Sequence, residues 1–260
     1  MRNKFVLLKP NLVDYIQRIR VDPNPILLGA AAECVRRLGA AGIVVGDGPG
    51  HERDDIERLL VESGLGSVLK DTGAEFIDLN REDVVGTPLR AQYTGLESLW
   101  LPKTALGANH VVSMPKVKTD HWSGVTLSMK NMVVPSVKNS WPKNLLHWRA
   151  IQPSMVDLAA NVPVHFVIAD ARVCTEGSGP LAGTSRRLSR MVSGDATRAM
   201  LMGPCPKRIP PVSETAKFPG HISALRIEQL ACPVLPPRVP FAPMPEFEHL
   251  RGVSDRRMSA

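Results

Sequence analysis

The chain has 260 residues, which is long enough to bury one large hydrophobic core or two small ones. Its 43% hydrophobic and 22% charged residues are ordinary for a globular protein, and a formal net charge of +7 favours anionic partners without identifying them. No apolar run approaches the roughly 18 residues of a membrane-spanning helix, and the first residues lack the features of a secretory signal. We therefore expect a cytoplasmic protein that does not associate with membranes.

Strand and helix patterns alternate along the first hundred residues. Short apolar runs predict strands at residues 5–8, 43–45 and 75–79. Apolar residues at helical spacing predict helices at 25–38, which begins with a proline, and at 53–63. Strands separated by helices indicate an α/β fold: a mostly parallel sheet with helices on both faces, in three layers.

Polar residues follow the first two of these strands. Lys9 and Asn11 come directly after the first strand, and Asp47 and His51 lie in the glycine-rich loop that leaves the second. Ligands of open parallel sheets bind outside the carboxyl ends of the strands. We therefore expect these four side chains to lie near a binding site.

The second half continues the alternation less regularly. Residues 111–114 and 166–169 predict strands, and residues 125–132 and 154–160 predict helices. The polar run 115–121 predicts a loop at the ligand-binding edge of the sheet.

Composition also sets the expected domain organisation. We predict one elaborated α/β domain over residues 1–232, with halves at about 1–109 and 110–232. Residues 233–260 are rich in Pro and Arg without periodicity and predict an irregular C-terminal tail.

Residues 110–150 carry most of the net charge. They hold six basic residues and one acid, Asp120, hence a local charge of +5, together with three histidines and three tryptophans. The basic residues are Lys116, Lys118, Lys130, Lys138, Lys143 and Arg149. Solvation alone explains Lys138 and Lys143, whereas Lys116 and Lys118 directly follow a predicted strand.

Three interpretations of this segment compete. Lysine ammonium groups can hold a phosphate or carboxylate while a histidine transfers protons. Alternatively, His51, His121 and His147 can bind a metal together with a carboxylate such as Asp47 or Glu176. A basic surface with interleaved aromatic residues suits single-stranded nucleic acid, which we regard as the weakest of the three.

No cofactor motif accompanies these residues. The glycine loop at 46–50 does not match G-x-G-x-x-G, and no G-x-x-x-x-G-K-[ST] loop is present. The four cysteines form no C-x-x-C pair, so neither an iron–sulfur cluster nor a dinucleotide is indicated for this chain.

Six short motifs occur in a fixed order along the chain. They are Leu8-Lys9-Pro10-Asn11-Leu12-Val13, Gly46-Asp47-Gly48-Pro49-Gly50, Met114-Pro115-Lys116-Val117-Lys118-Thr119-Asp120-His121-Trp122, Gly124-Val125-Thr126-Leu127-Ser128-Met129-Lys130-Asn131, Trp141-Pro142-Lys143-Asn144-Leu145-Leu146-His147-Trp148 and Glu176-Gly177-Ser178-Gly179-Pro180. Over roughly residues 5–230, this series resembles the family called domain of unknown function 362. The resemblance implies an α/β fold but no particular reaction. Some members carry a ferredoxin-like iron–sulfur module, which this chain lacks.

The resemblance also implies that the polar motif residues belong to one site. We assign ligand binding to the lysines and asparagines Lys9, Asn11, Lys116, Lys118, Lys130 and Asn131. We assign proton transfer and its orientation to His121, His147, Asp47 and Glu176. Candidate metal ligands are His51, His121 and His147.

The chain departs from its relatives after Asn131, where Met132 replaces a glycine-containing turn, and after Asp195, where several residues are absent. We predict an uncharacterised family member that binds a small anionic molecule at a Lys- and His-rich site and performs proton-transfer chemistry. The alternatives are a metal-dependent oxidoreductase or hydrolase, and a non-catalytic or inactive family member. Neither nucleic acid nor a membrane is an expected partner.

Overall fold

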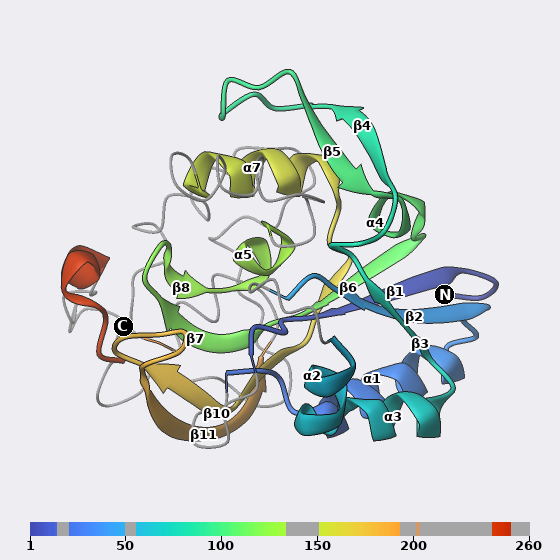
Figure 1. The fold of residues 1–260 in the computed structure, drawn as a ribbon, viewed down its shortest axis with the longest axis horizontal. Coiled ribbons are helices and arrows are strands. Elements are labelled where there is room, and N and C mark those ends of the chain that lie inside the picture. The colour runs from blue at the N-terminus through green and yellow to red at the C-terminus, as the bar shows by residue number, and fades with distance from the viewer. Residues whose placement is uncertain (15–20, 50–55, 134–150, 193–201, 203–240, 251–260) are drawn as a thin grey trace, which may run out of the picture.

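The computed structural model describes residues 1–14, 21–49, 56–133, 151–192, 202 and 241–250. Its central element is a five-stranded, entirely parallel sheet (Figure 1). The strand order is β3 (Glu75–Asp78), β2 (Gly42–Asp47), β1 (Phe5–Pro10), β6 (His110–Met114) and β9 (Phe166–Val167). The strands predicted at 5–8, 43–45, 75–79 and 111–114 are therefore confirmed.

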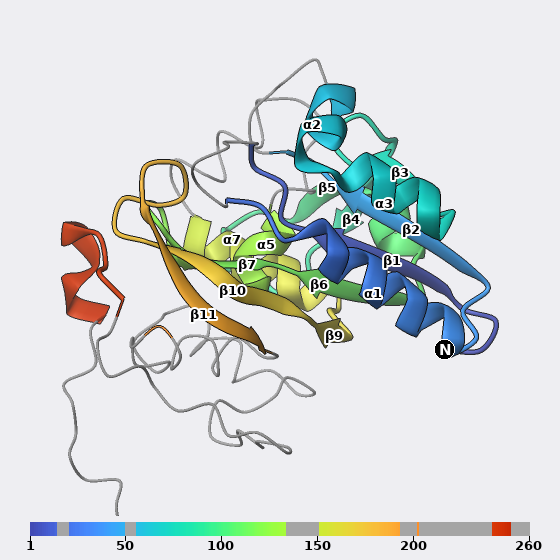
Figure 2. The same cartoon turned by 90° about the horizontal axis from the view of Figure 1, so that it is seen from below.

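Helices cover both faces of this sheet, and the predicted three-layer α/β fold is confirmed (Figure 1, Figure 2). One face packs on α1 (Pro25–Arg37), α2 (Ile56–Ser63) and α3 (Leu65–Thr72), and α3 was not predicted. The opposite face packs on α4 (Lys103–Gly107), α5 (Ser128–Val133) and α7 (Ile151–Asn161). Alternation along β1 produces the two cores, because Val6 and Leu8 face the first layer and Leu7 faces the second.

A second sheet of four strands lies beside the first, because β6 runs through Pro115 directly into β7 (Figure 1, Figure 2). The strand order is β11 (Thr184–Val192), β10 (Ala169–Glu176), β7 (Lys116–Asp120) and β8 (Gly124–Thr126). Strand β7 is parallel to β10 and antiparallel to β8, so this sheet is mixed.

Two local predictions are wrong in this region. The polar run 115–121, predicted as a loop, contains strand β7, and all five residues of that strand are buried. The predicted helix 125–132 is divided, because residues 124–126 form β8 and α5 begins only at Ser128. In both cases cross-strand pairing prevails over local composition.

An antiparallel hairpin, β4 (Val84–Pro88) and β5 (Ser98–Pro102), was also not predicted. The loop between its strands is fixed to α7, because the Asp157 carboxylate accepts hydrogen bonds from the Thr94 amide at 2.9 Å and the Thr94 hydroxyl at 2.6 Å.

Of the predicted tail, the structure describes only residues 241–250, which include the 3-10 helix η3 (Pro245–Leu250). Phe241 is buried in a small core with Val117, Val125 and Cys174 of the second sheet. None of the helices in the described ranges is long and apolar enough to cross a membrane.

Candidate functional site

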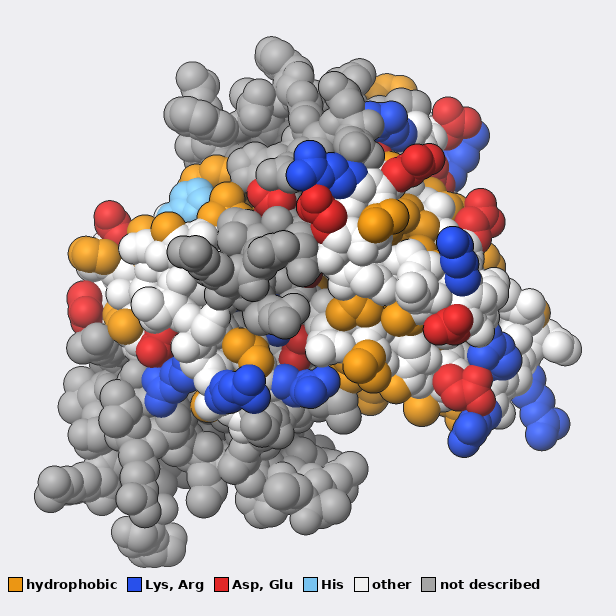
Figure 3. Space-filling view, turned by 60° about the horizontal axis from the view of Figure 1, so that its bottom comes forward, with side chains coloured by type: hydrophobic (Ala, Val, Ile, Leu, Met, Phe, Trp, Pro, Cys, Tyr) orange, Lys and Arg blue, Asp and Glu red, His pale blue; other side chains and the backbone are white. Residues whose placement is uncertain are grey.

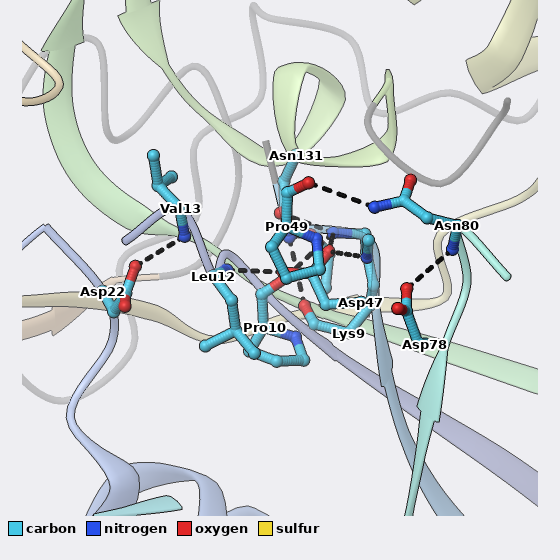
Figure 4. Close-up of polar contacts among 12 residues, drawn as sticks. Lys9, Pro10, Leu12, Val13, Asp22, Asp47, Pro49, Asp78, Asn80 and Asn131 are labelled. Atoms are coloured by element: carbon cyan, nitrogen blue, oxygen red, sulfur yellow. Dashed lines mark hydrogen bonds and ion pairs between the residues drawn. The ribbon is translucent and has the colours of Figure 1, made fainter. Parts of the chain in front are cut away.

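Lys9, at the end of β1, is the centre of a closed polar network (Figure 4). Its ammonium group is fully buried and donates to Asp47 Oδ1 at 2.5 Å, to Asn131 Oδ1 at 3.0 Å and to the Pro10 carbonyl at 3.0 Å. An ammonium group has three N–H donors. All three therefore have acceptors within the protein.

The partners of Lys9 are equally well satisfied. Asp47 also accepts from the amides of Leu12, at 2.5 Å, and Gly48, at 2.8 Å. Burial raises the pKa of Asp47, while Lys9 and these amides oppose the rise. The Asn131 amide group donates to the Lys9 carbonyl at 3.1 Å and to the Ser113 hydroxyl at 3.0 Å. The network thus joins β1, β2, β6 and α5.

Lys116, the first residue of β7, forms a second buried ion pair. Its Nζ lies 2.7 Å from Asp170 Oδ2, across the β7–β10 register. Asp170 also accepts from the amides of Asn24 and Arg172, both at 2.9 Å. Since Asn24 caps the N-terminus of α1, this pair ties the second sheet to the first helical layer.

A third ion pair joins Lys130 of α5 to Asp120, at 3.2 Å. Asp120 also accepts from the amide of Trp122 at 2.9 Å and from the amide and hydroxyl of Ser123 at 3.0 and 2.9 Å. Although burial opposes it, Lys130 and these donors lower the pKa of Asp120 to about 2. The Asp120 carboxylate is therefore ionised at neutral pH.

Lys118 lies on β7 between Lys116 and Asp120 and points to the same face of the strand. Its side chain is 1% exposed, yet its only hydrogen bond among the described residues is to the Val21 carbonyl, at 2.9 Å. Within the described part of the chain it forms no ion pair. Burial, together with Lys130 and Lys116, lowers the pKa of Lys118 to about 8, while Asp22 and Asp120 oppose the change.

Asp22 lies beside Lys118, because the carbonyl that Lys118 contacts belongs to the preceding residue. One carboxylate oxygen of Asp22, Oδ1, accepts from the Val13 amide at 2.7 Å (Figure 4). The other, Oδ2, is buried and has no hydrogen-bond donor within the ranges described. Burial raises the pKa of Asp22 to about 7, against the opposing effect of Lys118, and Asp47 adds to the rise.

Two further buried oxygens, one on β10 and one on the segment between β1 and α1, lack a partner in the described structure. Thr175 lies opposite Lys118 in the β10–β7 register, and its hydroxyl makes no hydrogen bond there. Asn11, which is 4% exposed and follows β1, has an Oδ1 without a donor. Buried polar groups are normally hydrogen-bonded, so such a concentration is characteristic of a ligand site.

The structure thus places the predicted lysines in two environments. Lys9, Asp47 and Asn131 satisfy one another, whereas Lys118 and Asp22 do not. Sequence reasoning missed Asp22 and Thr175. Asp22, followed by a proline and a helix-capping asparagine, has the composition of an ordinary turn, and no local pattern separates Thr175 from other strand residues.

Two other predicted site residues, His121 and Glu176, contact groups other than Lys118. His121 is exposed at the β7–β8 turn, and its ring lies 4.4 Å from that of Trp122. Glu176 pairs with Arg186 at 3.0 Å and accepts from the Ala242 amide at 3.2 Å, which fixes the segment at 241–242 to β10. His51 and His147 lie outside the described residues, as do Lys138 and Lys143.

Metal binding finds no geometric basis in the described ranges, where no three His, Cys, Asp or Glu side chains are grouped to hold an ion. The face drawn in Figure 3 carries both acidic and basic side chains. Along α1, Arg36 and Arg37 pair with Glu33, at 2.7 and 2.8 Å.

The fold and the site define an α/β protein with buried lysine–aspartate pairs where its two sheets meet. The model of the family described as domain of unknown function 362 matches residues 6–199, and the chain belongs to this family. The family departure after Asn131 is accommodated, because Met132 and Val133 are buried in the core beneath α7. The departure at Asp195 lies outside the described residues.

No curated protein matches the chain. Among solved structures, it is similar to the lactate racemase apoprotein of Thermoanaerobacterium thermosaccharolyticum, with a TM-score of 0.45 and 14% identity over 72% of this chain and 46% of that one. It is also similar to a protein of Thermotoga maritima, with a TM-score of 0.47 and 12% identity over 75% of this chain and 51% of that one. The chain spans about half the length of each.

Proposed function

We propose that this protein binds a small phosphate- or carboxylate-bearing ligand at Lys118, and that Lys118 and Asp22 exchange protons with it. The observation that carries the proposal is the pairing of the four site lysines. Lys9, Lys116 and Lys130 each form an ion pair with an aspartate, whereas Lys118 forms none among the described residues.

An anion near Lys118 would supply the charge that this lysine lacks. Burying an ammonium group without a counter-charge costs roughly several kcal/mol, because the group loses its hydration. A bound anion would offset part of this cost. Among the described residues the ammonium of Lys118 has one acceptor, the Val21 carbonyl, which leaves two N–H groups for a ligand. The hydroxyl of Thr175, across the strand pair, supplies a further donor.

Proton transfer is supported by the pKa values of the two groups. Lys118, at about 8, and Asp22, at about 7, lie on either side of ordinary cellular pH. Groups whose pKa values lie close to the working pH are the most effective general acids and bases. The proton-transfer roles of His121, His147, Asp47 and Glu176 remain predictions, and the contacts of Asp47 suit a structural role.

The test is thermal stabilisation of the full chain by inorganic phosphate, acetate and succinate, each at several concentrations. We expect stabilisation of the wild type and none of Lys118→Met. The matched control is Lys103→Met, because the Lys103 side chain is 59% exposed and pairs on the surface with Asp83. Equal stabilisation of the wild type and Lys118→Met by every anion overturns the proposal.

The pH dependence gives an independent check. Only the charged form of Lys118 attracts an anion, and its pKa is about 8. Affinity should therefore fall as the pH rises, by about tenfold for each pH unit well above 8. An affinity that stays constant to pH 10 assigns the binding to another group.

A further inference from the structure

The site offers acceptors as well as donors. Asp22 Oδ2 and Asn11 Oδ1 are both buried and both lack a hydrogen-bond donor within the described ranges. Both residues belong to the segment between β1 and α1. A ligand that carried only a negative charge would satisfy Lys118 but would leave these oxygens without a donor and would repel Asp22.

Acceptor and donor lie within reach of one small molecule. Lys118 contacts the carbonyl of Val21 at 2.9 Å, and Asp22 is the next residue. The Val13 amide donates to Asp22 Oδ1, whereas Oδ2 has no donor among the residues that the structure describes. The two charged groups influence each other but are too far apart to form an ion pair. A ligand that bridges them needs opposite charges on neighbouring atoms.

Charge balance points to the same kind of ligand. Each of the four site lysines has an aspartate that it pairs with or influences: Lys9 with Asp47, Lys116 with Asp170, Lys130 with Asp120, and Lys118 with Asp22. With all of them ionised, the charges cancel. A simple anion would leave one buried negative charge uncompensated, whereas a zwitterion preserves neutrality.

We infer, building on the proposed function, that the ligand is a small zwitterion of the amino acid class. Its carboxylate binds Lys118 and the Thr175 hydroxyl, and its ammonium group donates to Asp22 Oδ2 and Asn11 Oδ1. A divalent cation suits the same oxygens less well, since no three metal-binding side chains are grouped in the described ranges.

Proton linkage distinguishes this ligand from a simple anion. An ammonium group beside Asp22 lowers the pKa of that carboxyl from about 7, so binding at pH 6.5 releases a proton. A simple anion raises the same pKa and causes proton uptake at pH 6.5. A carboxylate beside Lys118 raises its pKa from about 8, so both ligands cause proton uptake at pH 8.5.

The experiment begins with each of the twenty common amino acids added singly to the full chain, with thermal stabilisation as readout. The best amino acid is then compared by calorimetry with its deaminated carboxylic acid, its hydroxy acid and its decarboxylated amine. We expect at least tenfold weaker binding for each analogue. Calorimetry at pH 6.5, in two buffers of different ionisation enthalpy, should show proton release for the amino acid alone.

Variants separate this inference from the proposed function. Asp22→Asn should reduce the preference for the amino acid over its deaminated acid to less than about threefold while both still bind, and Lys118→Met should abolish carboxylate binding. Circular dichroism confirms that each variant is folded, and Lys103→Met again serves as the control.

Three results overturn the zwitterion but leave anion binding intact. They are an equal affinity for the deaminated or hydroxy acid, a preference that survives Asp22→Asn, and binding of simple anions when no amino acid binds. The proposed function itself fails if neither phosphate nor any carboxylate stabilises the wild type, or if Lys118→Met binds them unchanged.

Discussion

Lys9 and Lys118 are both fully buried lysines on strands, and their surroundings differ in one respect. Lys9 has three acceptors, one of them a carboxylate at 2.5 Å. Lys118 has one acceptor, a backbone carbonyl, and no carboxylate in ion-pair contact within the described structure. Burial of a charged side chain therefore does not by itself indicate a functional role, because a fully paired lysine such as Lys9 can simply stabilise the fold.

The neighbouring carboxylates repeat this difference. Asp47 accepts hydrogen bonds from Lys9 and from two backbone amides. These bonds hold the end of β2 against the end of β1. Asp22 accepts from the Val13 amide, the Asp14 amide also lowers its pKa, and one buried oxygen, Oδ2, keeps no donor in the described ranges. The first region is a closed structural network, and the second is an open pair that a ligand can complete.

Of the substitutions considered, removal of the Lys9 charge should change the stability of the protein most. Lys9→Met leaves Asp47 buried without its counter-charge and should lower the free energy of unfolding by about 3–5 kcal/mol. Urea denaturation at pH 7 measures it, and Lys103→Met, an exposed control, should be unchanged. A Lys9→Met variant as stable as the wild type would contradict the structural role of the network.

The first sheet could be predicted from the sequence because its strands are apolar and its helices are amphipathic. The same patterns placed Lys9 and Asp47 at strand ends, and the structure brings these two residues into contact. A residue at the carboxyl end of a strand can be recognised locally, because it follows the point at which an apolar run stops. This part of the site was therefore accessible without coordinates.

The second sheet could not be predicted in this way. Lys116, Lys118 and Asp120 make β7 look like a loop, since alternating polar residues rarely form a buried strand. These residues can be buried because they pair with residues distant in the sequence. Lys116, for example, pairs with Asp170, which is 54 positions further along the chain. The partner of a buried charge is a tertiary property, and for that reason Asp22 and Thr175 were missed.

Lys118→Met should raise the free energy of unfolding, whereas Lys9→Met should lower it. The folded-state pKa of Lys118 is about 8, below its ordinary 10.5, so the folded protein binds fewer protons than the unfolded chain between these pH values. Wild-type stability from this group therefore rises with pH from 8 to 10.5 and is lowest below 8. The substitution should stabilise the protein by about 1–3 kcal/mol at pH 7.

Urea denaturation at pH 7 and pH 10 tests the sign and its pH dependence. The gain of Lys118→Met over the wild type should shrink at the higher pH, where the lysine is neutral in the folded protein. A loss of stability as large as that of Lys9→Met would mean that Lys118 is a paired structural lysine, and the contrast between the two regions would disappear.

Asp22→Asn should also raise the free energy of unfolding, over a different pH range. The pKa of Asp22 is raised from 3.8 to about 7, so the folded protein binds more protons than the unfolded chain between these values. The contribution of this group to stability is complete below pH 3.8 and is lost as the pH rises to 7. The amide variant should become the more stable protein by about 1–2 kcal/mol at pH 7.5.

Thermal denaturation of the wild type and Asp22→Asn from pH 4.5 to pH 7.5 measures this difference. Asp47→Asn provides the contrast, since it removes a carboxylate that three donors satisfy and should destabilise at pH 7.5. If Asp22→Asn and Asp47→Asn changed the stability equally, the number of hydrogen-bond donors around each carboxylate would not separate a structural aspartate from a ligand-binding one.

His121→Ala should have the smallest effect on stability and provides the sharpest test of the predicted proton-transfer role. The ring is exposed, and its plane is inclined at 54° to that of the adjacent Trp122, so its removal should leave the free energy of unfolding unchanged within error. If Lys118 holds the ligand and Asp22 exchanges protons with it, phosphate and carboxylate affinities should change less than twofold. Weakening of tenfold or more in a variant of unchanged stability would instead place His121 at the ligand. The ligand site would then extend to the β7–β8 turn, as the family resemblance implies.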